Sequence, residues 1–88
     1  MTEETKMANI MATFVSNYSD SRQWAIWDRG IDPNSPRPLF NDYLAPGEST
    51  QQTLYSADGI YGFAQYQRSD GPLQLVDNIT DGSQVSIS

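Results

Sequence analysis

Apolar and polar residues alternate along most of this chain, and glycine, proline, asparagine and aspartate interrupt the alternation at intervals. Such alternation is typical of β-strands that bury one face. The pattern predicts strands at 10–16, 22–28, 49–56, 60–68, 73–76 and 83–88. Leu39 and Phe40 are expected to reach the core, and 42–44 leads into the next turn. Turn signals about 8 to 12 residues apart favour an all-β fold, a small antiparallel β-sandwich of six to seven short strands.

The beginning of the chain allows two interpretations. Residues 1–8 are polar and charged, so we expect a flexible N-terminal tail there and a single β-sandwich domain over 9–88. A stripe with helical spacing overlaps the first predicted strand and consists of Met7, Ile10, Met11, Phe14 and Val15. The β-branched and aromatic residues within 12–16 favour a strand, and a helix remains the alternative.

The turn residues predict how the strands connect. The cluster at 17–21 is expected to close a hairpin between the first two strands, and Asp58-Gly59 carries the signal of a second hairpin turn. Pro46-Gly47 is typical of a type II turn at 45–48. Residues 29–38 hold three prolines and a glycine, so they are expected to form an irregular loop.

Alternation also assigns side chains to faces. The only two tryptophans stand three residues apart, so a strand at 22–28 points Trp24 inward with Ile26 and Trp27 outward. Gly62 in mid-strand predicts a bulge or the close approach of a bulky neighbour. The faces of 60–68 are ambiguous, with Tyr66 the alternative to Phe63. The predicted core is Phe14, Trp24, Ile26, Leu54, Phe63, Leu75, Val85 and Ile87.

Composition removes several classes of function. The chain has no cysteine and no histidine, so disulfides, Ser-His-Asp machinery and the usual zinc sites are excluded. Eighty-eight residues leave little room for a deep cleft with paired carboxylates, and no phosphate-binding motif is present. Asp28, Asp32 and Asn34 do not have the spacing of an EF-hand, so we interpret them as turn residues. We therefore expect no enzyme, catalytic residue, metal or cofactor.

The charge narrows the class of partner. Eleven acidic residues oppose five basic ones, for a net charge of −6, and the basic residues form no stripe. Binding to nucleic acid or to an anionic membrane is therefore not expected. No apolar run is long enough to insert into a membrane, and the first residues lack the layout of a secretory signal, so we expect a cytoplasmic protein. An acidic inhibitor of a basic partner remains an alternative.

Aromatic residues interleaved with amides are the most informative chemistry in the chain. Outward-facing rings can stack on the apolar face of a sugar while neighbouring polar side chains hydrogen-bond its hydroxyl groups. This interpretation predicts a non-catalytic, lectin-like binding module for a neutral polar ligand, with a site formed by Trp27, Asp28, Arg29, Tyr55 and Tyr61. The same residues suit a protein partner, so a protein-interaction domain or a self-assembling homo-oligomer is the second hypothesis.

Overall fold

A computed structural model describes residues 8–30 and 36–88 of the chain, and within these ranges it is an all-β sandwich. Its seven strands are β1 (Ala8–Ser16), β2 (Arg22–Asp28), β3 (Phe40–Leu44), β4 (Ser49–Ser56), β5 (Gly62–Arg68), β6 (Leu73–Ile79) and β7 (Ser83–Ile87). The predicted fold class is confirmed. No helix that could cross a membrane occurs in the described ranges.

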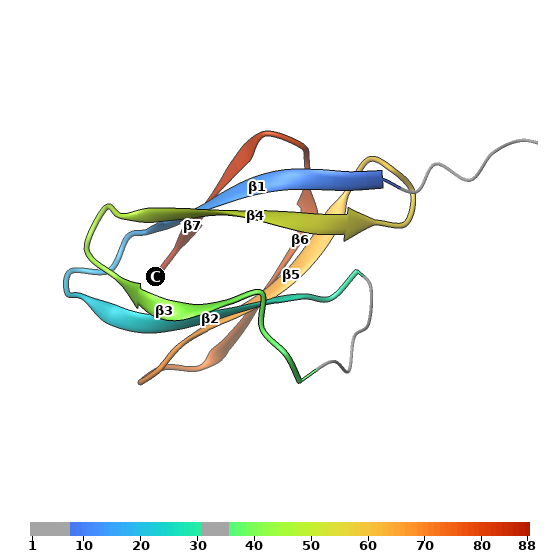
Figure 1. Cartoon of the computed structure of the whole chain (residues 1–88). Helices are drawn as coiled ribbons and strands as arrows, with labels where there is room; N and C mark the ends of the chain where they lie inside the picture. The colour runs from blue at the N-terminus through green and yellow to red at the C-terminus, as the bar shows by residue number, and fades with distance from the viewer. Residues whose placement is uncertain (1–7, 31–35) are drawn as a thin grey trace, which may run out of the picture.

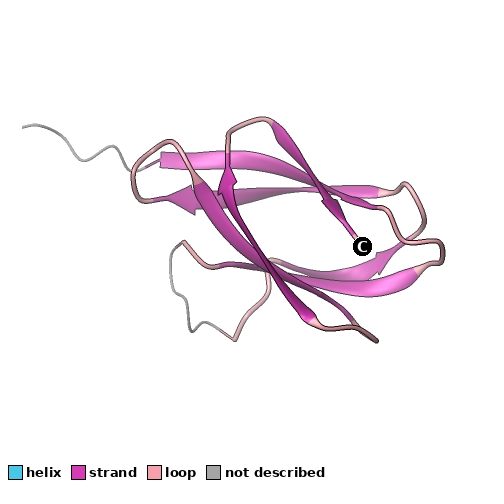
Figure 2. Cartoon of the chain, turned by 180° about the vertical axis from the view of Figure 1, so that it is seen from behind, coloured by secondary structure: helices cyan, strands magenta, loops and turns pink. Residues whose placement is uncertain are grey.

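The strands form two sheets that pack face to face. One sheet has the order β4-β1-β7 and the other the order β3-β2-β5-β6. Figure 1 shows β1 and β4 as one layer above β2 and β3, and Figure 2 shows the same two layers from behind. Neighbouring strands are antiparallel except β1 and β7, which pair in parallel with Ala12 opposite Ser83. That one pair departs from the expected fully antiparallel arrangement.

The first described segment is a strand, and its alternative as a helix is wrong. Alternate residues of β1 are buried, as period-two geometry requires, namely Ile10, Ala12, Phe14 and Ser16. Met11, which belongs to the helical stripe, is 37% exposed. The expected tail lies outside the described residues except for Ala8, which begins β1.

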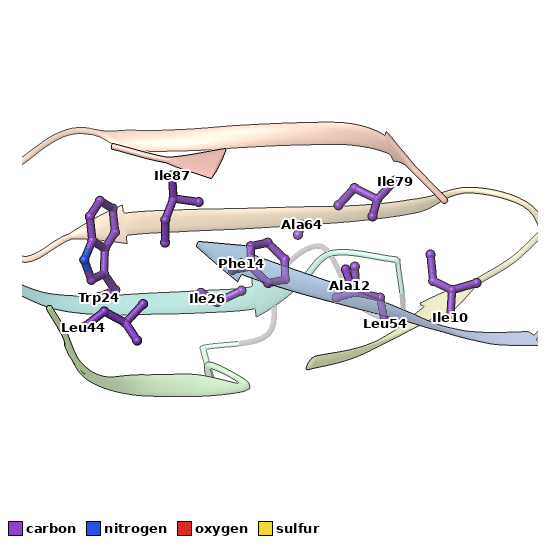
Figure 3. Close-up of a cluster of buried hydrophobic side chains, with 10 residues drawn as sticks. All are labelled: Ile10, Ala12, Phe14, Trp24, Ile26, Leu44, Leu54, Ala64, Ile79 and Ile87. Atoms are coloured by element: carbon purple, nitrogen blue, oxygen red, sulfur yellow. The ribbon is translucent and has the colours of Figure 1, made fainter. Parts of the chain in front are cut away.

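The core lies between the sheets along their whole length. Figure 3 shows Trp24 and Leu44 at one end of it and Ile10 and Ile79 at the other. The predicted core positions Phe14, Trp24, Ile26, Leu54 and Ile87 have no exposed surface, and Val85 packs against them from a half-buried position. Trp24 also contacts Tyr66, with ring centroids 6.1 Å apart and planes tilted by 51°.

Two predicted core residues, Phe63 and Leu75, do not lie in the core. Leu75 is 63% exposed, and Phe63 is half-buried on the outer face of β5. The reason is space, because a Cβ on Gly62 would come within 2.8 Å of Ile10 Cδ1. The inward-facing positions of β5 are therefore the small residues Gly62 and Ala64, followed along the strand by Tyr66. Leu75 pairs with Gln65 and must share that residue's outward face.

A bulge completes this arrangement. Gly62 pairs with Ile79 but Ala64 pairs with Val76, so β6 carries one more residue than β5 in this interval. The extra residue lets both Val76 and Ile79 point toward the core, although strict alternation would separate them. The bulge or close approach predicted from Gly62 is confirmed in both forms.

Both predicted hairpins are wrong. Residues 17–21 lead from β1 to β2, and residues 57–61 lead from β4 to β5, and in each case the two strands belong to different sheets. Five residues are long enough to cross the roughly 10 Å between packed sheets, whereas a two-residue turn is not. By contrast, the type II turn is confirmed, because Gly47 has φ of 81° and Glu48 N donates to Ala45 O at 2.9 Å.

Candidate functional site

Two of the predicted site residues lie together on the outer face of the four-stranded sheet. Trp27 is half-buried there, and its Nε1 donates to Pro36 O at 3.2 Å. The guanidinium of Arg29 lies 5.5 Å from the centre of the Trp27 ring. Arg29 Nε also donates to Gln65 Oε1 at 3.0 Å, and Gln65 pairs directly with Trp27. The tryptophan, the arginine and the amide therefore form one contiguous cluster.

Asp28 points the other way, toward the interior, and is only 8% exposed. Its Oδ2 accepts the backbone N–H of Tyr55 at 2.8 Å, and its Oδ1 accepts the N–H of Gly30 at 2.9 Å. Gly30 approaches β4 so closely that a Cβ there would collide with the carbonyl oxygen of Tyr55. Asp28 thus joins β2 of one sheet to edge strand β4 of the other.

The two predicted tyrosines lie elsewhere. Leu54 and Ser56 are buried, so Tyr55 between them points to the outer face of the three-stranded sheet. Tyr61 is 47% exposed and lies in the turn before β5, where its N–H donates to Asp58 Oδ1 at 2.9 Å. The structure therefore brings Trp27 and Arg29 together on the outer face of the four-stranded sheet. Tyr55 points to the outer face of the three-stranded sheet, and Tyr61 lies in the turn before β5.

The outer face of the four-stranded sheet contains a hollow of about 240 Å³ that the sequence did not reveal. Its floor is Ala25, whose methyl group leaves a gap between longer neighbours. The strand register places Asn41 on one side of Ala25 and Gln67 on the other. The lining residues are Gln23, Trp24, Ala25, Asn41, Gln67 and Ser69, of which Trp24 turns its ring to the core.

Hydrogen bonds hold the amides of this hollow in place. Gln23 Nε2 donates to Asn41 Oδ1 at 2.8 Å, and Gln67 Nε2 donates to the Gly71 carbonyl at 3.0 Å. A side-chain amide has two donor hydrogens and an acceptor oxygen, so each retains further capacity for a ligand. The described residues that line the hollow carry no charge. The only feature of the sequence that points to the hollow is the series of outward-facing amides. Which of these amides become neighbours depends on the strand register.

A charged cluster closes one end of the sandwich and is a structural feature. The guanidinium of Arg68 lies 4.0 Å from the Tyr18 ring centre, and that of Arg22 lies 5.5 Å from it. Asp70 accepts hydrogen bonds from Arg68 and from Arg22 Nε, the latter at 3.3 Å. The Arg68 hydrogen bond, with a further one from Arg22, holds the pKa of Asp70 below its ordinary value. The Asp70 hydrogen bond in turn raises the pKa of Arg22.

Other acidic residues cap backbone donors. Asp58 Oδ1 accepts the N–H groups of Tyr61 and Ile60, and these bonds lower the pKa of Asp58. Asp42 Oδ1 accepts the N–H of Tyr43 at 2.7 Å, and Asp81 Oδ1 accepts that of Met11 at 2.8 Å. Within the two described ranges no group of acidic side chains is arranged to hold a metal ion. Asp32 and Asn34 lie outside those ranges.

Comparison with known proteins adds no family to this description. No protein-family model matches the chain, and no match is found among curated proteins or solved structures. The chemistry that suits the hollow is therefore inferred from its own side chains.

Proposed function

We propose that this protein is a non-catalytic binding module that takes a neutral polar ligand, such as one ring of a saccharide, on the outer face of its four-stranded sheet. The observation that carries the proposal is the amide-lined hollow over Ala25. Its position between Asn41 and Gln67 follows from the pairing of three adjacent strands in unbroken register, so it stands on a regular part of the sheet.

The chemistry of the hollow suits hydroxyl groups. A hydroxyl both donates and accepts a hydrogen bond, and the amides of Gln23, Asn41 and Gln67 offer both functions. The volume of about 240 Å³ is below the 300–1,000 Å³ typical of pockets that enclose a whole drug-sized ligand. The hollow therefore fits a single small ring of a larger molecule that otherwise extends along the sheet.

The Trp27 cluster extends this surface along β2. Trp27 occupies the next outward position after Ala25, about 7 Å further along the strand. Its half-buried ring offers an apolar surface for a second ring, and Arg29 and Pro36 hold its orientation. Trp27 and Arg29 are the part of the predicted site that the proposal keeps.

Charge supports a neutral ligand rather than a basic partner. An acidic inhibitor needs carboxylates that are free to face the partner. Asp28, Asp42, Asp58 and Asp70 instead accept hydrogen bonds from the chain's own backbone or arginines. These internal hydrogen bonds make the acidic-inhibitor hypothesis weaker than the hypothesis of a neutral ligand.

A saccharide array probed with the purified full-length chain tests the proposal. The wild type is compared with Ala25→Leu, which fills the floor of the hollow from an outward-facing position. Gln51→Ala serves as the control, because Gln51 is exposed on the other sheet. We expect a defined signal for the wild type and Gln51→Ala and its loss in Ala25→Leu. Thermal melting establishes that each variant is folded.

Two results would contradict the proposal. A blank array for the wild type would remove the support for a saccharide ligand, and the protein-interaction hypothesis would replace it. A signal that Ala25→Leu retains at full strength would place the binding site elsewhere on the molecule.

A further inference from the structure

Within the part of the chain that the structure describes, the two sheets have four edge strands, and these are protected unequally. An edge strand presents unpaired backbone groups that can pair with another chain unless they are blocked. On β3 the carboxylate of Asp42 caps the N–H of Tyr43, and on β4 the carboxylate of Asp28 caps the N–H of Tyr55. On each of these two edges, an aspartate carboxylate therefore occupies an outward-facing N–H group and hinders pairing with another strand.

The hydrogen bonds of β5 show which backbone groups of β6 face the open edge. Arg29 N donates to Phe63 O and Ser69 N donates to Gln23 O, each at 2.9 Å, so odd-numbered residues of β5 bond toward β2. Antiparallel strands alternate their bonding direction, so Ala64 and Tyr66 bond toward β6. Their partners there are Val76 and Gln74. The N–H and C=O groups of Leu73 and Leu75 consequently point away from the sheet.

The side chains at these two positions are also apolar and exposed. Leu73 is 52% exposed and Leu75 is 63% exposed, and residues 73–76 carry no charge. No hydrogen bond from elsewhere in the described ranges reaches their outward backbone groups. The remaining edge strand, β7, is shorter and carries Gln84 and Ser86 on its outer face. β6 is therefore the edge best suited to pair with another strand.

We propose that β6 pairs antiparallel with β6 of a second copy, about a two-fold axis that passes through Gln74. This register places Leu73 opposite the partner's Leu75, and both leucines then exchange backbone hydrogen bonds with the other chain. The leucine side chains lie on the same face and pack across the junction. The contact is isologous, so it closes at a dimer and leaves no β6 edge exposed.

The chain around β6 fits this register. Asp77 falls opposite Gly71 of the other copy, so no acidic residue faces another across the junction despite the net charge of −6. Pro72 lacks an N–H, but even-numbered positions face β5 and not the partner. The bulge before Ile79 and the positive φ of Asn78, 55°, end the regular part of the edge. The pairing segment is thus confined to 72–76.

Dimerisation goes beyond the proposed ligand-binding function. A two-fold axis perpendicular to the sheet continues the sheet from one copy into the next with its outer faces on one side. The hollows over Ala25 in the two copies then face the same direction. A bound polymer with repeated rings could occupy both hollows and gain affinity through the higher effective concentration of the second site.

Sedimentation velocity of the full chain between about 1 μM and about 1 mM tests the dimer. Leu75→Lys places a charge on the open edge, a substitution that natural edge strands use against pairing. Tyr43→Lys is a matched control, because Tyr43 has the same exposure of 63% and the equivalent outward position on the opposite edge of the same sheet. We expect the wild type and Tyr43→Lys to dimerise with rising concentration and Leu75→Lys to remain monomeric.

The proposal is overturned if the wild type stays monomeric throughout, or if Tyr43→Lys abolishes association as fully as Leu75→Lys. The first result shows that β6 does not pair with itself, and the second shows general adhesion of the outer face. Neither sedimentation result involves a saccharide. Absence of a dimer therefore does not contradict the proposed ligand site, and a blank saccharide array does not contradict the dimer.

Cross-linking tests the register itself, because the chain contains no cysteine of its own. The two copies of residue 74 form a non-hydrogen-bonded pair with Cα atoms about 4.5 Å apart, which a disulfide can span. We expect Gln74→Cys to oxidise to a disulfide-linked dimer at least about tenfold faster than Gln84→Cys on β7. Equal rates for the two variants would contradict the Gln74-centred pairing.

Discussion

The carboxylate of Asp28 in β2 accepts the backbone N–H of Tyr55 in β4 at 2.8 Å and so links the two sheets of the sandwich. The same carboxylate accepts the N–H of Gly30. Both residues of the pair were expected to contact a ligand. This hydrogen bond gives the Asp28 carboxylate a structural role and engages only the backbone of Tyr55. The ligand-binding proposal rests on outward-facing residues of β2, β3 and β5.

Replacing Asp28 with alanine is expected to lower the free energy of unfolding by about 1–3 kcal/mol, because it leaves the N–H of Tyr55 without its acceptor in a mostly buried site. Urea denaturation measures the change. Asp77→Ala is the control, since Asp77 is exposed on β6 and its loss should cost less than about 0.5 kcal/mol. Equal effects of the two substitutions would show that the Asp28 bridge does not stabilise the fold.

Leu54 and Leu75 offer a direct test of the assigned faces. Leu54 has no exposed surface, so Leu54→Ala should cost about 2–5 kcal/mol through lost burial and a residual cavity. Leu75 is 63% exposed, so Leu75→Ala should change stability by no more than about 0.5 kcal/mol when it is measured at low protein concentration. A large loss for Leu75→Ala would mean that the faces of β6 are reversed.

Gly30 is expected to tolerate no side chain. A Cβ there would collide with the Tyr55 carbonyl oxygen and would lie 3.2 Å from Asp28 Oδ1, so Gly30→Ala must displace backbone. Overpacking of this kind costs about 1–3 kcal/mol, which thermal or urea unfolding measures. Unchanged stability would mean that residues 28–30 do not approach β4 this closely in solution.

Stability is expected to fall in acid, because hydrogen bonds lower the pKa of both Asp58 and Asp70 in the folded chain. The unfolded chain then binds more protons than the folded chain below about pH 4, near the ordinary aspartate pKa of about 3.9. The stabilisation by these groups is therefore fully present above that pH and is lost as the pH falls below it. The midpoints of urea unfolding at pH 7 and at pH 3 measure this loss of stability. They are compared for the wild type, Asp58→Asn and Asp70→Asn.

Each variant should be less stable than the wild type at pH 7 and should lose less stability on acidification. Added salt should reduce the difference in stability between the wild type and Asp70→Asn, because the Asp70 carboxylate and its arginine partners are partly solvated. Parallel pH profiles for all three proteins would show that neither carboxylate contributes.

Much of the fold follows from local patterns in the sequence. Alternation places Phe14, Trp24 and Leu54 inside, and Pro46-Gly47 specifies its turn, because each depends on adjacent residues alone. Trp24 is buried and Trp27 lies on the outer face, as the three-residue spacing of the tryptophans predicts.

Features that depend on which strands become neighbours could not be predicted. The turns at 17–21 and 57–61 have the composition of hairpins, and only the sheet order shows that they cross between sheets. Phe63 is turned outward by Ile10, more than fifty positions away in the sequence. The hollow over Ala25 is invisible until the register brings Asn41 and Gln67 beside it.

Amide chemical-shift mapping tests the central claim most directly, namely that the outer face of the four-stranded sheet binds the ligand. Uniformly ¹⁵N-labelled protein is titrated with a panel of neutral mono- and disaccharides. We predict saturable shifts at Gln23, Ala25, Asn41 and Gln67 and at the Trp27 indole, with Thr53 and Gln84 on the other sheet unchanged. Shifts confined to the three-stranded sheet, or no saturable shift with any saccharide, would contradict the account.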